Sequence, residues 1–252
     1  MVEFSVVICS VDDEKFKHVE HTYQTVLAGE SFEIIRISDA KGLCEGYNRG
    51  IEASQGAVVI LSHDDAAPVR PFAAKLRRHL RTVDIVGGAG TDRLIGPAWF
   101  TQGPPHTFGQ VLNVVPKTGA LSLSIFGVPS PLVTGIQALD GFWMAARRSV
   151  LEKGKAWFDA KTFTGFHFYD LDFSLTAYKR GFAIGVATDL SLCHASSSGY
   201  NDQWKAEVPT FLNKWKDHLL PAVPRNFTFA TINFNEMNQA VGVMDELVER
   251  SR

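Results

Sequence analysis

A histidine and two adjacent carboxylates, His63-Asp64-Asp65, directly follow the apolar run 58–62. Neighbouring carboxylates repel each other, so their placement at the end of a buried strand is unfavourable unless a cation lies near. A divalent metal held by a carboxylate and by substrate phosphates would provide that cation. A helix N-cap or a solvated turn before Pro68 explains the same residues without any ligand.

A second acidic cluster, Asp170 and Asp172, follows the aromatic segment 166–169. Two residues apart on a helix, these side chains would point roughly 200° apart, so they cannot share one task. A carboxyl group surrounded by aromatic rings has a raised pKa, which suits a general base. A simple N-cap role for Asp170 explains its position equally well.

Three further groups suit a binding site. Asp140 precedes Gly141, and its carboxylate could accept hydrogen bonds from a sugar hydroxyl, although Asp-Gly is also a common turn. His194 follows an apolar strand and suits a metal ligand or a proton carrier, although a lone histidine is more often structural. The run Ser196–Ser198 suggests an anion-binding loop.

The first ninety residues predict the elements that would bring these groups together. Strands are expected over 4–11, 32–37, 57–62 and 85–89, and helices over 16–27, 45–54 and 71–81. This alternation indicates a parallel sheet, in which ligands bind beyond the carboxyl ends of the strands. Ser10, Asp39 and His63-Asp64-Asp65 all fall at such ends. We therefore expect polar groups to gather at one edge of the sheet.

The remainder of the chain changes character. Residues 91–139 are rich in glycine, proline and aromatic residues, and they predict a loop or a substrate-binding wall. Beyond them, strands are expected over 138–147, 182–188 and 190–194, and helices over 149–154, 170–179, 207–219 and 235–249. No repeat or linker divides the chain, so a single domain is expected.

The composition excludes several classes of protein. The 252 residues hold 25 Lys and Arg against 27 Asp and Glu, a net charge of −2 that argues against a nucleic-acid partner. Three dispersed cysteines fit a reducing cytoplasm better than a disulfide framework. The uncharged stretch 118–139 is too interrupted by Pro and Gly to predict a membrane span, and no signal peptide is expected. The P-loop, dinucleotide-binding and Gly-x-Ser-x-Gly motifs are all absent from the sequence.

The order of the motifs resembles the GT-A fold glycosyltransferases of the family-2 type, inverting enzymes that use nucleotide-sugar donors. It looks most like the bacterial group in which the metal motif reads His-x-Asp rather than Asp-x-Asp. The segments that carry the resemblance lie between Phe4 and Ser198: 4–11, 33–39, 48–56, 58–65, 88–90 with Trp99, 138–147, 158–159, 165–174, 181–182 and His194.

The resemblance implies an α/β fold of the GT-A (Rossmann-like) type, with a mixed, mainly parallel sheet flanked by helices. It divides the domain 1–252 into a nucleotide-binding half (1–90), a donor sugar and acceptor half (91–198) and a C-terminal extension (199–252). It implies a role for each of the following residues: Asp170 as catalytic base with Asp172 as its structural companion; Asp65, His194 and His63 as ligands of Mn²⁺ or Mg²⁺; Ser10, Asp39 and Asp64 as nucleotide contacts; and Asp140, Gly141 and Trp143 near the donor sugar and acceptor.

Two positions depart from the commoner pattern of that group. His63 replaces the first carboxylate of the metal motif, and Tyr169 stands where a glutamate often precedes the base. The first departure affects the affinity and identity of the metal.

The expected activity is transfer of a sugar from a donor, taken to be UDP-linked, to an acceptor hydroxyl in bacterial glycan biosynthesis. The acceptor is a glycan, a lipid-linked sugar, a protein or a small molecule, and peripheral membrane association is compatible with the sequence. Three alternatives remain: a sugar nucleotidyltransferase, a non-catalytic nucleotide-sugar-binding module, and a metallohydrolase that uses His63, Asp65, His167 and His194.

Overall fold

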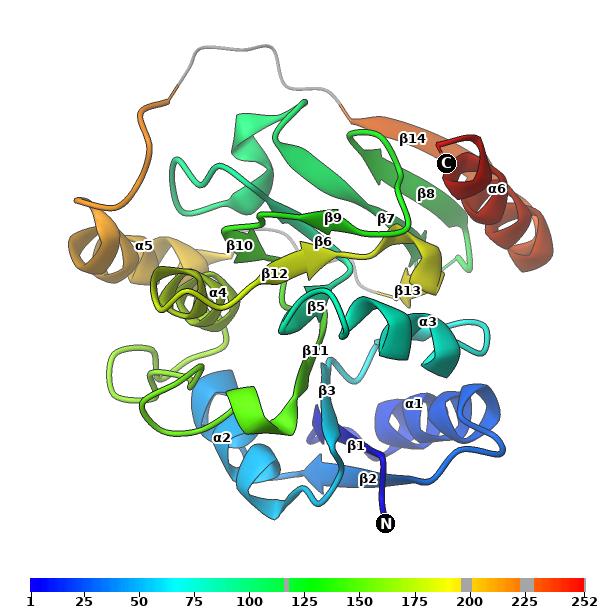
Figure 1. Ribbon diagram of the computed structural model, residues 1–252, viewed down its shortest axis with the longest axis horizontal. Coiled ribbons are helices and arrows are strands. Elements are labelled where there is room, and N and C mark those ends of the chain that lie inside the picture. Colours follow the sequence, from blue (N-terminus) through cyan, green and yellow to red (C-terminus); the bar gives the residue numbers. More distant parts are fainter. Residues whose placement is uncertain (116–117, 196–200, 223–228, 252) are drawn as a thin grey trace.

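The computed structural model describes residues 1–115, 118–195, 201–222 and 229–251. It forms two mixed sheets with helices packed around them (Figure 1). The first sheet has the order β2-β1-β3-β11-β5-β12-β9, and the second has the order β10-β6-β7-β13-β4 with β8 and β14 continuing from β7. The predicted α/β class with a mainly parallel core sheet flanked by helices is confirmed.

The first sheet combines the N-terminal strands β1, β2, β3 and β5 with three strands from later in the chain. Its strands are β1 (Phe4–Cys9), β2 (Phe32–Ile37), β3 (Val58–Ser62), β5 (Ile85–Gly87), β9 (Val133–Thr134), β11 (Trp143–Arg147) and β12 (Ile184–Val186). β1 pairs in parallel with both β2 and β3, and β11 enters antiparallel between β3 and β5. β1 and β3 therefore end side by side, which places Ser10 and residues 63–65 at one edge as expected.

Three helices connect these strands: α1 (Asp13–Val26), α2 (Leu43–Ala53) and α3 (Ala73–His79). α1 begins earlier than the apolar pattern predicts because the Asp12 side chain accepts hydrogen bonds from the backbone N–H groups of Glu14 and Lys15. Gly50 of α2 packs against Val7 so closely that an added Cβ would lie 2.1 Å from a valine methyl group. This contact holds α2 against β1.

The second sheet corrects the expectation that residues 91–139 form a loop. Its strands are β4 (Ala66–Pro68), β6 (Ala89–Thr91), β7 (Thr107–Val114), β8 (Leu121–Phe126), β10 (Ala138–Leu139), β13 (Leu192–His194) and β14 (Ala230–Phe234). β8 reads Leu-Ser-Leu-Ser-Ile-Phe, and this alternation is the pattern of a half-buried strand. The prediction was wrong because the glycines and prolines around β8 are typical of loops, whereas the alternation within it is that of a strand.

The C-terminal half supplies α4 (Tyr169–Lys179), α5 (Asp202–Trp215) and α6 (Met237–Arg250), together with short 3₁₀ turns at Trp99–Gln102, Arg148–Val150 and Thr188–Leu190. α5 begins five residues before the predicted start because Asn201 caps it, accepting a 2.8 Å hydrogen bond from the N–H of Trp204. α6 covers the second sheet, where Val241 and Met244 pack with Leu112 and Leu123. The predicted serine loop 196–198 lies outside the described residues.

Within the described ranges, none of the helices is both long enough and apolar enough to cross a bilayer.

Candidate active site

Most of the predicted site residues line one cavity of about 590 Å³. The cavity lies beyond the ends of β1 and β3 and reaches the start of α4. Its polar lining comes from Ser10, His63, Asp64, Asp65, Asp140, His167, Asp170 and His194. Residues separated by up to 184 positions in the sequence therefore face the same space.

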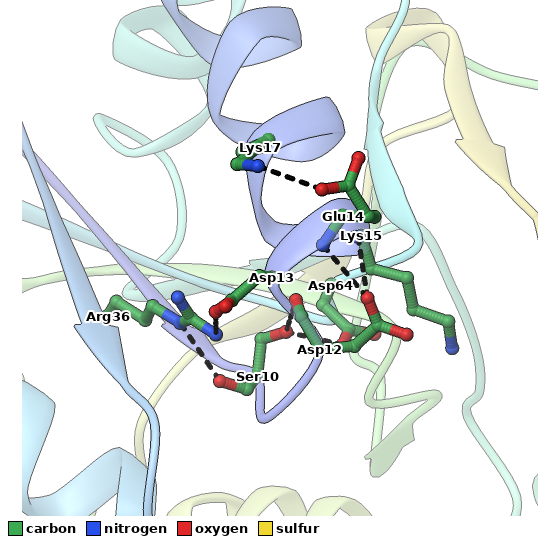
Figure 2. Close-up of polar contacts among 8 residues, drawn as sticks. All are labelled: Ser10, Asp12, Asp13, Glu14, Lys15, Lys17, Arg36 and Asp64. Atoms are coloured by element: carbon green, nitrogen blue, oxygen red, sulfur yellow. Dashed lines mark hydrogen bonds and ion pairs between the residues drawn. The ribbon is translucent and has the colours of Figure 1, made fainter.

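The loop after β1 is fixed by polar contacts that hold Ser10 toward the acidic pair (Figure 2). Ser10 Oγ lies 2.7 Å from Asp64 Oδ2 and 3.0 Å from the carbonyl oxygen of Asp12. Arg36 Nε donates a 3.0 Å hydrogen bond to the carbonyl oxygen of Ser10, and its guanidinium also pairs with Asp13 at 2.7 Å. Asp64 is thus held by the β1 loop and is directed differently from its neighbour Asp65.

Asp65 meets two histidines on the other side of the acidic pair. Its Oδ1 lies 3.3 Å from His194 Nε2 and 3.9 Å from His63 Nδ1. Each of the three residues offers one possible ligand atom, and these three atoms all lie within 4.8 Å of one another. Oδ1 of Asp65 is buried and accepts no hydrogen bond from the described residues. A buried carboxylate oxygen that accepts no hydrogen bond is unfavourable, and two imidazole nitrogens lie beside this one, so the donor set fits a divalent cation.

The protonation of this cluster also suits metal binding, because metal ligands must be deprotonated. Burial, followed by the nearby His194, lowers the pKa of His63 to about 4, so its imidazole is neutral at pH 7. Burial acts to raise the pKa of Asp65, but the neighbouring His194 and His63 outweigh it, and the net pKa lies below the ordinary value. At neutral pH the cluster therefore offers a carboxylate and at least one unprotonated imidazole nitrogen.

Asp170 forms a separate acidic centre at the start of α4. Its Oδ2 accepts a 2.9 Å hydrogen bond from the N–H of Gly141. Burial, and then the charge of Asp140, raises the pKa of Asp170 to about 7. Gly141 is required here because an added Cβ would lie 2.2 Å from the Tyr169 hydroxyl. A carboxyl group that titrates near neutral pH and lines the cavity is suited to taking a proton from a substrate.

Asp140 is held by hydrogen bonds beside this centre. Trp99 Nε1 donates to Asp140 Oδ2 at 2.8 Å, and the N–H of Phe142 donates to Asp140 Oδ1 at 3.2 Å. With these two hydrogen bonds in place, Asp140 lines the same cavity as Asp170. Asp140 is therefore placed to bind a hydroxyl while its charge keeps the pKa of Asp170 high.

Asp172 points away from Asp170, as the helical geometry predicts. Its Oδ1 lies 2.6 Å from Lys214 Nζ and accepts a 2.8 Å hydrogen bond from Trp215 Nε1. Lys214 also bonds to Asp159 at 2.8 Å. The Asp172 side chain is only 1% exposed, so Lys214 on α5 supplies the positive charge that allows this carboxylate to be buried. Helix α5 thereby fixes α4, the helix that carries Asp170.

Replacement of Lys214 by methionine is expected to destabilise the fold by about 3 kcal/mol, because it leaves Asp172 buried without its cation. Chemical denaturation at pH 7.5 measures the change in the free energy of unfolding. The exposed Lys216 is the matched control, and Lys216→Met should change stability by less than about 0.5 kcal/mol. Equal effects of the two substitutions would show that the Lys214 ion pairs contribute no particular stability.

Three of the residues predicted as ligand contacts, Asp39, Gly141 and Trp143, are not among those that line the cavity. Gly141 contributes instead through its N–H, which bonds to Asp170. Trp143 is fully buried, and its Nε1 donates a 3.0 Å hydrogen bond to the Tyr23 hydroxyl. The prediction that Trp143 contacts the donor sugar is therefore wrong, because its position on β11 directs the ring into the core. Asp39 is exposed and bonds to Arg49 at 2.7 Å, while its neighbours Ile37 and Ala40 line the cavity. The nucleotide role of Asp39 stays a prediction.

His167 stands apart from the metal-type cluster. Its Nε2 lies 3.0 Å from Asn201 Oδ1, and the donor cluster among the described residues consists of His63, Asp65 and His194. Of the four residues named for a metallohydrolase, His63, Asp65 and His194 therefore lie together, and His167 does not join them.

Aromatic side chains also line the cavity, and two of them come from the segment 166–169 that precedes Asp170 in the sequence. They are Trp99, Phe100, Phe166, Phe168 and Trp204. They come from three separate segments, so no single motif identifies them. Phe168 adopts a left-handed backbone conformation, with φ of 61°, immediately before α4. Such a conformation is uncommon for a bulky residue and is often found at functional sites.

Residues 5–215 match the protein family described as "Glycosyltransferase like family", and the chain belongs to this family. Its class is therefore that of the glycosyltransferases. None of the curated proteins matches the sequence.

Solved structures of S. aureus TarS, residues 1–349, are similar to the chain. One is 13% identical with a TM-score of 0.44, covering 86% of this chain and 72% of TarS. A complex of TarS with UDP-GlcNAc is 14% identical with a TM-score of 0.46, covering 79% of this chain and 60% of that one. A complex with UDP is 15% identical with a TM-score of 0.43, covering 84% and 66% of the two chains. At this level of similarity the ligands are properties of TarS alone.

Proposed function

We propose that this protein is a metal-dependent, inverting glycosyltransferase that moves a sugar from a UDP-linked donor to an acceptor hydroxyl. The observation that carries the proposal is the presence of two distinct centres in one cavity. Asp65 and two histidines bring together donor atoms that could hold a cation, and Asp170 carries a carboxyl group whose pKa is about 7. Transfer from a nucleotide sugar requires both functions, one at the diphosphate and one at the attacking hydroxyl.

The cation site would be formed by His63 Nδ1, Asp65 Oδ1 and His194 Nε2. Two imidazoles beside one carboxylate favour Mn²⁺ over Mg²⁺, because Mg²⁺ prefers oxygen ligands and sheds its water reluctantly. When bound, the metal would neutralise the charge that develops on the leaving diphosphate. Ser10 and Asp64 would contact the nucleotide beside it.

Asp170 would remove the proton from the acceptor hydroxyl as that oxygen attacks the anomeric carbon. Its Oδ2 remains oriented by the Gly141 N–H, and Asp140 would hold a sugar hydroxyl close by. The proposed base lies on α4, whereas the proposed cation ligands lie in the turn after β3 and on β13. A base and a cation site on separate elements are compatible with attack from the face opposite the leaving group, and inversion is part of the proposal.

The proposal also includes a role in bacterial glycan biosynthesis in the cytoplasm. The aromatic residues that line the cavity suit an acceptor sugar, since aromatic rings offer flat apolar contact area. All three cysteines are free, which is consistent with a reducing compartment.

A panel of nucleotides and nucleotide sugars, each measured with and without Mn²⁺, tests this function by thermal unfolding. UDP and UDP-sugars should raise Tm most, and only when Mn²⁺ is present. A ligand at a hundred times its Kd adds about 2.7 kcal/mol of stability. Stabilisation without any hydrolysis or transfer of the donor would instead favour the nucleotide-sugar-binding module. Stabilisation that does not depend on Mn²⁺ would contradict the metal site.

The pH dependence of kcat/KM provides a separate prediction. Asp170 must be ionised to act as a base, and its pKa is about 7. The rate should therefore rise tenfold per pH unit below about pH 7 and level off above it. UDP release at saturating Mn²⁺ between pH 5.5 and 8.5 measures this profile. A profile that falls over this range would argue against a carboxylate base.

A further inference from the structure

The two positions at which the sequence departs from the common family pattern are in direct contact. His63 Nε2 lies 2.5 Å from the Tyr169 hydroxyl, although the residues are 106 positions apart. The Tyr169 side chain is buried, and its ring packs at 5.8 Å from the ring of Tyr47. The hydrogen bond therefore joins the β3–β4 turn to the first residue of α4.

This contact determines which nitrogen of His63 faces the other donor atoms. Because Tyr169 occupies Nε2, the other ring nitrogen, Nδ1, faces Asp65 at 3.9 Å. A neutral imidazole carries one N–H, so only one of its nitrogens can be a metal ligand. If Nδ1 carried the proton, it would be expected to donate it to Oδ1 of Asp65, which accepts no hydrogen bond from the described residues. The 3.9 Å separation is too long for that hydrogen bond.

We propose that Tyr169 is a positioning residue of the metal site. Its hydroxyl oxygen accepts a hydrogen bond from Nε2–H of His63, which leaves Nδ1 unprotonated and directed toward Asp65 and His194. Groups that hold a ligating histidine in this way orient its ring and fix its tautomer. This role rests on the proposed function, because it assumes that the cluster binds a divalent cation.

The surroundings of Tyr169 make it a rigid support. The close approach of Gly141 leaves no room for a Cβ, and the rings of Tyr47 and Phe158 pack against the tyrosine. Tyr169 also adjoins Asp170 on the same helix. One side chain therefore links the position of the base to the position of the metal ligands.

Long-range ¹H–¹⁵N NMR of the metal-free native protein tests the tautomer without any substitution. The His63 imidazole should carry its proton on Nε2. A proton on Nδ1 in the native protein would overturn the proposal, because that nitrogen could not then accept a metal.

Calorimetric titration with Mn²⁺ alone tests the consequence for affinity. Tyr169→Phe should weaken Mn²⁺ binding about tenfold, whereas Tyr178→Phe, which removes an exposed hydroxyl from the same helix, should leave it unchanged. In a His63→Ala background, Tyr169→Phe should have no further effect on the affinity. A tenfold loss that persists in that background would show that Tyr169 does not act through His63, and would overturn the proposal.

The same titrations separate this inference from the proposed function. If the native protein binds Mn²⁺ and Tyr169→Phe binds it equally well, the positioning role is overturned and the metal-dependent function stands. If the native protein binds no Mn²⁺, the metal site itself is overturned, together with the role of Tyr169. Thermal unfolding of each variant shows whether a loss of affinity comes from a loss of the fold.

Discussion

Replacement of Asp170 by asparagine is expected to lower kcat about a thousandfold, which is within the usual range for loss of a general base. Asparagine has the same shape and can still accept the hydrogen bond from the Gly141 N–H, but it cannot take a proton. The Kd for the donor and for Mn²⁺ should be unchanged, because the nucleotide and metal contacts lie on other elements. Single-turnover measurements of sugar transfer, with calorimetry for binding, separate these effects.

The stability of the Asp170→Asn variant provides the control. The folded-state pKa of Asp170, about 7, lies above its ordinary value of 3.8. Ionisation therefore opposes folding, and this carboxyl group makes the native protein progressively less stable as pH rises from about 4 to 7. Asparagine does not ionise, so the variant does not lose stability in this way. It should be at least as stable as the native protein at pH 8. Native turnover by a folded variant would exclude Asp170 as the base.

Replacement of Asp65 by asparagine is expected to weaken Mn²⁺ binding at least about a hundredfold and to reduce turnover by a similar factor. The charged ligand of the cluster is lost, whereas the fold loses little, because Oδ1 of Asp65 accepts no hydrogen bond from the described residues. Titration with Mn²⁺ and the rate of UDP release measure the two effects.

Asp64→Asn is the matched control for this substitution. Asp64 is adjacent in sequence but bonds to Ser10 and lies outside the His63, Asp65 and His194 cluster. Its Mn²⁺ affinity in the absence of nucleotide should therefore remain close to native. If Asp64→Asn lost Mn²⁺ binding while Asp65→Asn retained it, the two carboxylates would have the opposite roles.

The sequence predicts the edge of the sheet that holds the site better than it predicts the outer parts of the fold. Alternating strands and helices predict parallel β1, β2 and β3, and the rule that ligands bind at strand ends predicts the cavity beside Ser10 and residues 63–65. Helical geometry also predicts that Asp170 and Asp172 point in different directions. These inferences depend on local spacing, which a single sequence contains.

The contacts that the sequence does not predict are those between distant segments. Lys214 reaches Asp172 across 42 positions, and Tyr169 reaches His63 across 106, so neither pair belongs to a local pattern. The inward direction of Trp143 depends on the register of β11 between β3 and β5. Register places a side chain on one face of a sheet or the other, and an isolated strand motif does not specify it.

Anomalous scattering from a crystal grown with Mn²⁺ and UDP tests the central claim most directly. The account predicts one Mn²⁺ peak within coordination distance of Asp65 Oδ1, His194 Nε2 and His63 Nδ1, with UDP beside Ser10 and Asp64. A peak elsewhere in the cavity, or UDP bound with no peak at these three residues, would contradict the account.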